Sequence, residues 1–310
     1  MTSGNANPAE GRGWGGALSW PAGHVTKYNC FRDAIASTGL EPPEHIEPGR
    51  WVRFPGLGKS KSNRAGWCYL FPDEQAGAFG CWATCLSETW HAERRHFTQK
   101  ERAAFRRQIA EAKHRAELEQ AETWARAASR ALDIWHEAET ADPEHEYLKT
   151  KAVGPHCARQ SGPRLVLPIV GWDGALSSLQ FIGPDGEKRM LKGGRKRGRF
   201  IPVHGRRGAN KILIGEGFAT VATLAEAEPE ALTLAALDAG NLEPVAVEAR
   251  KRNPTAEIVI AADADAVGIS KARAAAIACA GQVAVPVFPM GSEGSDWNDL
   301  AALNRKGGAQ

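Results

Sequence analysis

The chain has 310 residues, of which 43% are hydrophobic and 24% are charged, so it has the composition of a soluble globular protein with one large core or two smaller ones. No apolar run approaches the roughly 20 residues that a membrane-spanning helix needs, and the polar, glycine-rich N-terminus lacks the apolar core of a signal peptide. The six cysteines are scattered, as in proteins of a reducing compartment. These features predict a cytoplasmic protein that does not interact with a membrane.

The N-terminal third of the chain is rich in tryptophan, proline and glycine. Residues 1–19 are expected to be a disordered lead-in, and residues 20–96 are expected to form a small β-rich module of short strands and turns. Its aromatic residues are interpreted mainly as its core, with one or two as an alternative platform for stacking template bases: Trp51, Trp67, Phe79, Trp82 and Trp90. The basic residues Arg53, Lys59, Lys61 and Arg64 keep that alternative open.

Several cysteines and histidines of this module raise the question of zinc. An irregular site is conceivable from Cys68, Cys81 and Cys85 with either His91 or His96. Their spacing matches no standard zinc pattern, however, and free cysteines in a small core are the favoured interpretation.

The middle of the chain changes composition twice. Residues 97–150 are rich in Ala, Glu, Arg and Lys with apolar residues at helical spacing, which predicts a long amphipathic helix or a helix pair. Residues 151–209 are expected to form a β-rich subdomain with antiparallel hairpins at the Trp-Asp-Gly and Pro-Asp-Gly turns. Its stretch from Lys188 to Lys211 holds ten Lys and Arg residues and no acid, which indicates a polyanionic partner, although a solvated loop is the alternative.

From residue 210 onward, apolar runs alternate with alanine-rich segments. The apolar runs "KILIG", "LTLAA", "EIVIAA" and "QVAVPVF" alternate with helical segments expected at 218–227, 242–252 and 269–280. This βαβαβαβ order predicts a parallel sheet with helices packed on it, and the runs lack polar alternation because such strands are buried on both faces. The predicted fold class of residues 210–310 is therefore α/β.

Acidic residues follow the ends of these predicted strands. Glu216 follows the first, Asp263 and Asp265 follow the third, and Asp296 and Asp299 lie beyond the last. Because ligands of open parallel sheets bind beyond the carboxyl ends of the strands, these carboxylates are expected to lie together and to need a cation such as Mg²⁺ or Mn²⁺ among them. Each acid has a plainer interpretation as a helix cap or turn residue, and Asp238 is assigned that plainer role.

The ordered set of acids resembles the Toprim domain of bacterial-type DNA primases, topoisomerases and certain nucleases. "ILIGEGFAT" matches the glutamate motif of that domain, "IVIAADADAVG" its Asp-x-Asp motif, and "SDWNDL" resembles the later acidic motif of primases. Together with "SLQFIGPDGEKRMLKGGRKRGRF" and "LDAGNL", the chain is similar to primases of conjugative plasmids, integrative elements and satellite phages over most of residues 45–302. The resemblance implies a Toprim parallel sheet preceded by a small β-rich region and a long helix.

The resemblance also implies roles for individual residues. Glu216 is implied to be a metal ligand or a base close to the metal, and Asp263 and Asp265 are implied to hold the catalytic Mg²⁺ or Mn²⁺. Asp296, with Asn298 or Asp299, is implied to support a second ion or a triphosphate. The residues implied to hold nucleotide or template phosphates are Lys192, Arg195, Lys196, Arg197 and Arg199, with Asn298.

The leading hypothesis is a DNA primase, a DNA-directed RNA polymerase that makes short RNA primers from ribonucleoside triphosphates on a single-stranded DNA template of a mobile element. A replicative helicase encoded separately is the expected partner, because the chain contains no P-loop pattern. A Toprim nuclease that cleaves phosphodiester bonds is one alternative. A single-stranded DNA-binding accessory without catalytic activity is the other.

Overall fold

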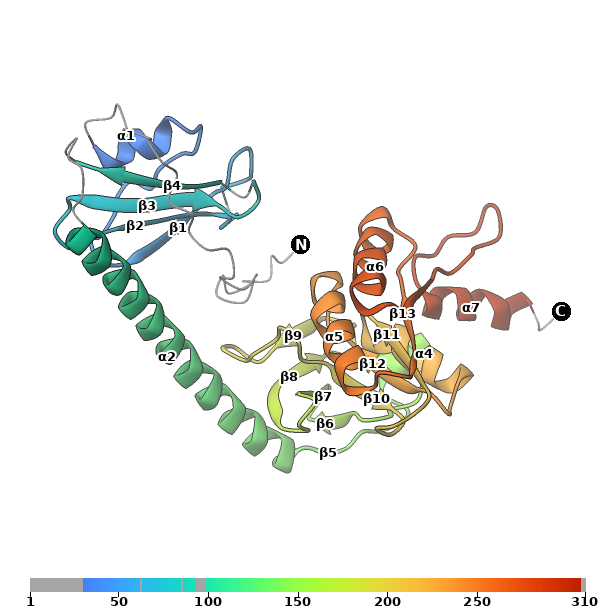
Figure 1. The fold of residues 1–310 in the computed structure, drawn as a ribbon. Coiled ribbons are helices and arrows are strands. Elements are labelled where there is room, and N and C mark those ends of the chain that lie inside the picture. Colours follow the sequence, from blue (N-terminus) through green and yellow to red (C-terminus); the bar gives the residue numbers. More distant parts are fainter. Residues whose placement is uncertain (1–29, 62, 85, 93–98, 308–310) are drawn as a thin grey trace. The chain divides into compact units, whose positions relative to one another are not determined.

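A computed structural model describes residues 30–61, 63–84, 86–92 and 99–307 (Figure 1). The expected lead-in, residues 1–19, lies outside the described residues. The chain divides into two compact units, residues 1–113 and 114–310, and the boundary falls within a long helix. Within the described ranges, no helix combines the length and the apolar content that crossing a bilayer requires.

Unit 1 consists of an antiparallel sheet with a short helix packed against it. Its elements are α1 (Phe31–Ala36), β1 (Trp51–Phe54), β2 (Gly66–Leu70), β3 (Ala76–Cys81) and β4 (Leu86–His91), with the strands in the order β1-β2-β3-β4. Phe31 and Ile35 of α1 pack against Phe54, Phe79 and Trp90 of the sheet, so these aromatic residues form the core of the unit.

The aromatic residues on β1 and β2 are arranged differently. The ring of Trp51 lies 5.4 Å from that of Trp67 and 5.3 Å from that of Tyr69, measured between centroids. Trp51 is 36% exposed, whereas Trp67 and Tyr69 are buried. Among these three aromatic side chains, Trp51 is therefore the one that solvent reaches.

Helix α2 (Gln99–Glu137) is a single helix rather than a helix pair, and its C-terminal part packs on the second sheet of the chain. Ala131 of α2 shares a buried cluster with Val166 and Leu179 of that sheet, and the small alanine side chain allows helix and sheet to approach closely. The sheet, sheet B, has the antiparallel order β5-β6-β7-β8-β9 and comprises β5 (Glu139–Thr140), β6 (Arg159–Ser161), β7 (Arg164–Val170), β8 (Leu176–Ile182) and β9 (Lys188–Met190), with α3 (Glu146–Lys151) between β5 and β6.

The two hairpins predicted in this region are present. β7 pairs with β8 across the Trp-Asp-Gly turn, and β8 pairs with β9 across the Pro-Asp-Gly turn. Gly174 and Gly186 both have a φ of 82°, a conformation that glycine adopts without the steric cost of a side chain.

The third sheet, sheet C, is the predicted parallel sheet. Its order is β10-β12-β11-β13-β14, and the pairs β11–β12, β11–β13 and β13–β14 are parallel. Its elements are β10 (Ile201–His204), β11 (Lys211–Gly215), α4 (Phe218–Ala227), β12 (Leu232–Ala235), α5 (Ala239–Arg252), β13 (Glu257–Ala261), α6 (Ala266–Cys279), β14 (Gln282–Ala284) and α7 (Trp297–Gly307). The fold prediction for this region is confirmed, with β10 added as an antiparallel edge strand.

Helices cover both faces of sheet C. On one face, α5 and α6 lie side by side and pack on Ile212, Ile258 and Ile260 (Figure 1). On the other face, α4 contributes Phe218 to a cluster that also contains residues of β7 and β10. Sheets B and C therefore share one hydrophobic cluster, and both belong to unit 2.

Candidate active site

Three of the predicted acids lie at one edge of sheet C because they follow neighbouring parallel strands. Ile214 of β11 is level with Ile260 of β13, and Glu216 and Asp263 come two and three residues later. Asp265 follows as the N-cap of α6. The three side chains therefore lie at the carboxyl ends of two adjacent strands, β11 and β13.

Glu216 and Asp263 are half-buried and carry oxygens that lack partners. Among the described residues, Oε1 of Glu216 and Oδ1 of Asp263 are buried without a hydrogen-bond donor. Burial, together with the charges of Asp263 and Asp265, raises the pKa of Glu216 to about 7, and the amide of Ala239 partly offsets that rise. Burial also raises the pKa of Asp263 to about 6, with Asp296 and Asp265 adding to the effect. A cation would relieve both the desolvation and the repulsion.

Asp265 is exposed and partly committed to helix capping. Its Oδ1 accepts a hydrogen bond from the backbone N–H of Gly268 at 2.7 Å, which leaves its other oxygen available. At Gly268, a Cβ would lie 2.9 Å from the backbone oxygen of Asp263. The glycine therefore allows α6 to approach the end of β13.

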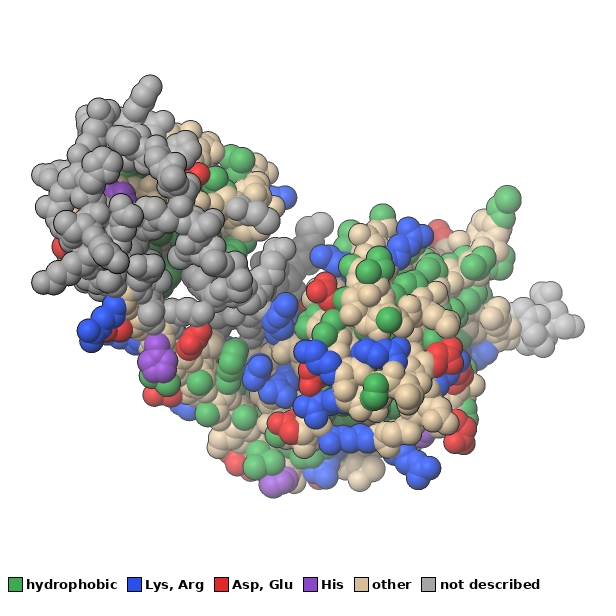
Figure 2. All heavy atoms as spheres, in the orientation of Figure 1, with side chains coloured by type: hydrophobic (Ala, Val, Ile, Leu, Met, Phe, Trp, Pro, Cys, Tyr) green, Lys and Arg blue, Asp and Glu red, His purple; other side chains and the backbone are tan. Residues whose placement is uncertain are grey.

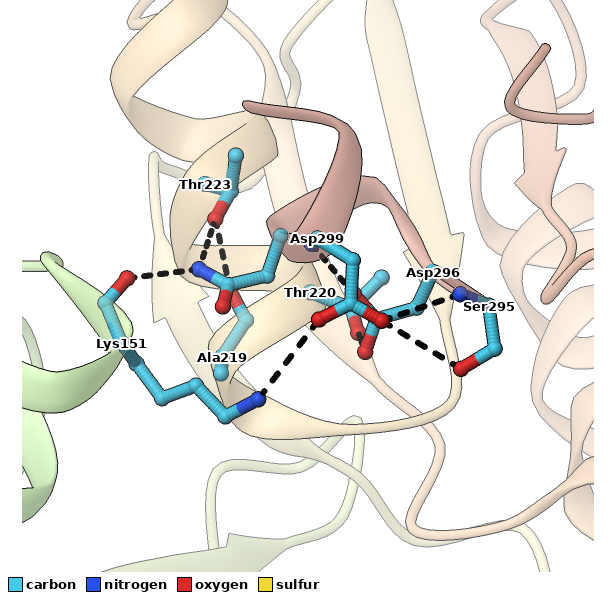
Figure 3. Close-up of polar contacts among 8 residues, drawn as sticks. Lys151, Ala219, Thr220, Thr223, Ser295, Asp296 and Asp299 are labelled. Carbon is cyan, nitrogen blue, oxygen red and sulfur yellow. Dashed lines mark hydrogen bonds and ion pairs between the residues drawn. The ribbon is translucent and has the colours of Figure 1, made fainter. Parts of the chain in front are cut away.

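Asp296 and Asp299 hold the start of α7. Asp296 accepts hydrogen bonds from Thr220 Oγ1 at 3.2 Å and from the Asp299 amide at 2.9 Å. Asp299 lies between Ser295, whose amide donates to it at 3.0 Å, and Lys151, whose Nζ is 4.0 Å away (Figure 3). Both carboxylates already have protein partners, so their predicted contact with a second ion stays a prediction.

Asn298, predicted to contact nucleotide, has a different environment. The residue is only 3% exposed, and its side-chain amide donates to Lys151 O at 2.7 Å and to Thr223 Oγ1 at 2.9 Å. These acceptors lie on α3 and α4 (Figure 3). Asn298 therefore anchors α7 to both helices through its side-chain NH2 group, and its expected contact with nucleotide stays a prediction.

The carboxylates of Glu216, Asp263 and Asp265 at the carboxyl ends of β11 and β13 are called the acidic edge below. Their oxygen atoms are ligands that suit a divalent cation. Within the described part of the chain, no group of three or more His, Cys, Asp or Glu side chains is already close enough to form a metal site. Two buried oxygens without donors and two raised pKa values nevertheless fit carboxylates that a bound cation would stabilise. Glu216, Asp263 and the second oxygen of Asp265 are the groups that would hold the ion.

The predicted basic residues lie on the segment that leads into β10, and three of them have partners within unit 2. The guanidinium of Arg195 lies 4.8 Å from the ring centroid of Trp124, Lys196 forms an ion pair with Asp238, and Arg199 lies 3.7 Å from Asp173. The other two, Lys192 and Arg197, are exposed. In Figure 2, Lys and Arg side chains gather on the face of unit 2 that carries α5.

Lys188, on β9, was not predicted as a site residue but lies close to the acidic edge. A Cβ on Gly217, next to Glu216, would be 3.5 Å from its Nζ. Burial lowers the pKa of Lys188, as does Lys151, whereas Asp296 and Asp263 act in the opposite direction. Its position in a basic run without a motif gave no signal of this proximity.

Two of the three cysteines that suggested zinc lie in the core of unit 1. Cys68 and Cys81 are buried in the same apolar cluster, and burial raises the pKa of Cys68 to about 12. At Cys68 this environment disfavours the thiolate that zinc requires. Burial alone would also raise the pKa of Cys81, but hydrogen bonds from Leu57, Thr84 and Ala83 outweigh this effect, and the pKa is instead lowered. Cys85 and His96 lie outside the described residues.

Comparison with known proteins shows what residues 211–307 and the whole chain are similar to. The model of the Toprim domain family matches residues 211–307. Two proteins of Escherichia coli, both called DNA primase TraC, are 33% identical over 290 residues and 30% identical over 301 residues. These alignments cover 86% and 90% of this chain but only 27% and 21% of the relatives, so the chain spans about a quarter of their length.

Among solved structures, the primase fragment of the bacteriophage T7 primase-helicase protein matches with a TM-score of 0.41 and 13% identity, covering 83% of this chain and 97% of that one. Together, the family match and the two relatives confirm the resemblance on which the site was predicted. Residues 211–307 match the Toprim domain family, within a chain that is similar over most of its length to DNA primases of Escherichia coli.

Proposed function

We propose that the chain is the catalytic part of a DNA primase that synthesises short RNA primers on single-stranded DNA. The observation that carries the proposal is the acidic edge of a Toprim sheet, where Glu216 and Asp263 present buried oxygens without donors. The similarity to DNA primases over 86% of the chain supports the choice of reaction. A helicase on a separate chain and a role in a mobile element stay predictions from the sequence.

The proposed reaction is nucleotidyl transfer. The 3′-hydroxyl of one nucleotide loses its proton to water, and its oxygen attacks the α-phosphorus of the next nucleotide. A new O–P bond forms, and pyrophosphate leaves with the electrons of the broken P–O bond. A bound Mg²⁺ or Mn²⁺ supplies activation of the hydroxyl and neutralises charge on the phosphates. Hard carboxylate oxygens favour these two ions over softer metals.

The acidic and the basic residues of the chain have different proposed roles. Glu216, Asp263 and Asp265 hold the metal, while Lys188 and the basic residues 192–199 bind triphosphate and template phosphates that the carboxylates alone would repel. Lys192 and Arg197 are exposed and so are accessible to the DNA backbone. The exposed Trp51 of unit 1 offers a face on which a template base can stack.

The test is a primer-synthesis assay with labelled ribonucleotides on a mixed single-stranded template, with Mg²⁺ and Mn²⁺ compared. Replacing both Asp263 and Asp265 by Ala is expected to abolish incorporation while the circular dichroism spectrum stays native. The matched control replaces two exposed acids, Glu230 and Glu257, which lie at the amino ends of β12 and β13, opposite the candidate site. Full incorporation by the Asp263/Asp265 variant would contradict the proposal.

A second assay separates synthesis from the alternatives. Labelled single-stranded DNA is incubated with Mg²⁺ or Mn²⁺ and without nucleotides. Cleavage that depends on Asp263 would favour a nuclease. DNA binding with a strong salt dependence but no incorporation on any template would favour a non-catalytic accessory.

A further inference from the structure

The segment 236–241, "ALDAGN", links the acidic edge of sheet C to residues 196–199, which precede β10 and are called the basic turn below. It follows β12, the neighbour of β11, and runs directly into α5. The amides of Ala236 and Leu237 donate to Gly215 O at 2.8 Å and Glu216 O at 2.9 Å. The backbone on either side of the Glu216 side chain is therefore held by this segment.

The side chain of Asn241 reaches from this segment into the basic turn. Residues 196–199 form a tight turn in which the Arg199 amide donates to Lys196 O at 2.9 Å. Asn241 Oδ1 accepts the Gly198 amide at 2.8 Å, and Asn241 Nδ2 lies 3.2 Å from Lys196 O and 2.8 Å from Arg199 O. One amide side chain thus replaces the backbone partners that this turn would otherwise lack.

The side chain of Asn241 also contacts the segment 236–241 to which it belongs. Its Nδ2 lies 2.8 Å from Ala236 O, and the residue is only 4% exposed. Because an amide group has two N–H donors, its three carbonyl acceptors share them, and no donor is left for water or ligand. The side chain is a fully used bridge between the end of β12 and the basic turn.

Asp238 adds a charged contact to the same bridge. Its Oδ1 accepts the Asn241 amide at 3.1 Å as the N-cap of α5, and its Oδ2 forms an ion pair with Lys196. Between Asp238 and the strand, Leu237 has a φ of 77°, which a residue with a side chain adopts only where its surroundings compel it. A simple turn needs neither this strain nor two side chains directed at one distant segment.

We propose that Asn241, assisted by Asp238, is a positioning residue that fixes the basic turn 196–199 relative to Glu216. In the free protein, the turn would then already have the orientation in which Arg197 and its neighbours meet the phosphates of a ligand on the acidic edge. Such preorganisation lowers the entropic cost of binding. The inference rests on the proposed function, because it assumes that triphosphate or template binds at this turn.

The variant Asn241→Ala tests this role. Loss of the bridge is expected to raise the KM for ribonucleoside triphosphate on the order of tenfold, as the loss of outer-shell contacts commonly does, with a smaller change in kcat. Mn²⁺ binding, followed by electron paramagnetic resonance, should stay at the wild-type level because the three metal-holding carboxylates are untouched. Hydrogen exchange at the amides of 196–200 should accelerate, because Gly198 loses its acceptor.

Two further variants make the test specific. Asn253→Ala removes an asparagine at the other end of α5 whose Nδ2 donates to Ala249 O at 3.1 Å, and it should change neither KM nor exchange at the turn. Asn241→Asp should be worse than Asn241→Ala, because it directs a carboxylate at three carbonyl oxygens.

Failure of this inference is distinguishable from failure of the proposed function. If the wild-type chain makes no primers, fluorescence anisotropy with a labelled single-stranded oligonucleotide gives the affinity instead, and Asn241→Ala is then expected to weaken that binding on the order of tenfold. Faster exchange at the turn with unchanged KM and unchanged DNA affinity would overturn the positioning role. Absence of both nucleotide and DNA binding by the wild-type chain would overturn both proposals.

Discussion

Replacing Gly268 by Ala perturbs the candidate metal site without touching a carboxylate. A Cβ at this position would lie 2.9 Å from Asp263 O and 3.2 Å from Asp263 Cβ, whereas ordinary contacts begin at 3.4 Å. The new methyl group therefore needs about 0.5 Å of additional room, and the end of β13 or the start of α6 must move to provide it. Displacing Asp263 by this amount is expected to weaken Mn²⁺ binding on the order of tenfold.

The effect on stability is expected to be small because two contributions oppose each other. The steric conflict costs about 1–3 kcal/mol, while Ala is favoured over Gly inside a helix by about 1 kcal/mol. The melting temperature should therefore fall by only a few degrees. Weak metal binding in a nearly unchanged fold is the combination that this geometry predicts.

The measurement is a titration with Mn²⁺ in which free Mn²⁺ is followed by electron paramagnetic resonance, alongside thermal unfolding. The matched control is Ala274→Gly on the exposed side of α6, which should cost about 1 kcal/mol of stability and leave Mn²⁺ affinity unchanged. Wild-type Mn²⁺ affinity in folded Gly268→Ala would refute the reasoning that this glycine sets the position of Asp263.

Three other substitutions have defined expectations. Asn298→Ala removes two hydrogen bonds of a buried side chain and should lower the free energy of unfolding by about 1–3 kcal/mol in a denaturant titration. Asn304→Ala, on the exposed face of α7, should change this free energy by less than about 0.5 kcal/mol. Asp263→Asn should raise the melting temperature of the metal-free protein, because it removes a half-buried charge. Mn²⁺ at a hundred times Kd should stabilise the wild type by about 2.7 kcal/mol and raise its melting temperature, whereas the variant should show no such rise; an equal rise in both proteins would place the ion elsewhere. Trp51→Ala should weaken single-stranded DNA binding by about 1–3 kcal/mol in fluorescence anisotropy, and Leu57→Ala, also exposed on unit 1, should not; equal losses would argue against base stacking.

The parallel sheet could be predicted because its determinants are local. The strand β11 consists of a short apolar run, and α4 occupies 218–227 as its alanine-rich pattern indicates. Since β11 and β13 are parallel neighbours, the position of Glu216 and Asp263 at one edge follows from the motif order. That edge of the candidate site was therefore accessible from the sequence.

The contacts between distant segments could not be predicted in the same way. Asn298 and Lys151 are 147 residues apart, and nothing in "SDWNDL" indicates that its asparagine is buried against α3. The ion pair of Asp238 with Lys196 likewise depends on the packing of β10 beside β12, which the four-residue strand "IPVH" does not announce. From the sequence, Asp238 is recognisable only as an aspartate before a helix, so its ion pair with Lys196 could not be distinguished from simple helix capping.

The hydrophobic cluster shared by sheets B and C limits how the chain can be truncated. A fragment that began at residue 210 would lose β10, leaving the backbone of β12 as an open sheet edge, and would expose Phe218 and Val221 of α4 to water. Open edges and apolar faces of this kind promote aggregation. A fragment that carries sheet C is therefore expected to need sheet B as well, so the smallest autonomous piece of this chain should begin upstream of β5.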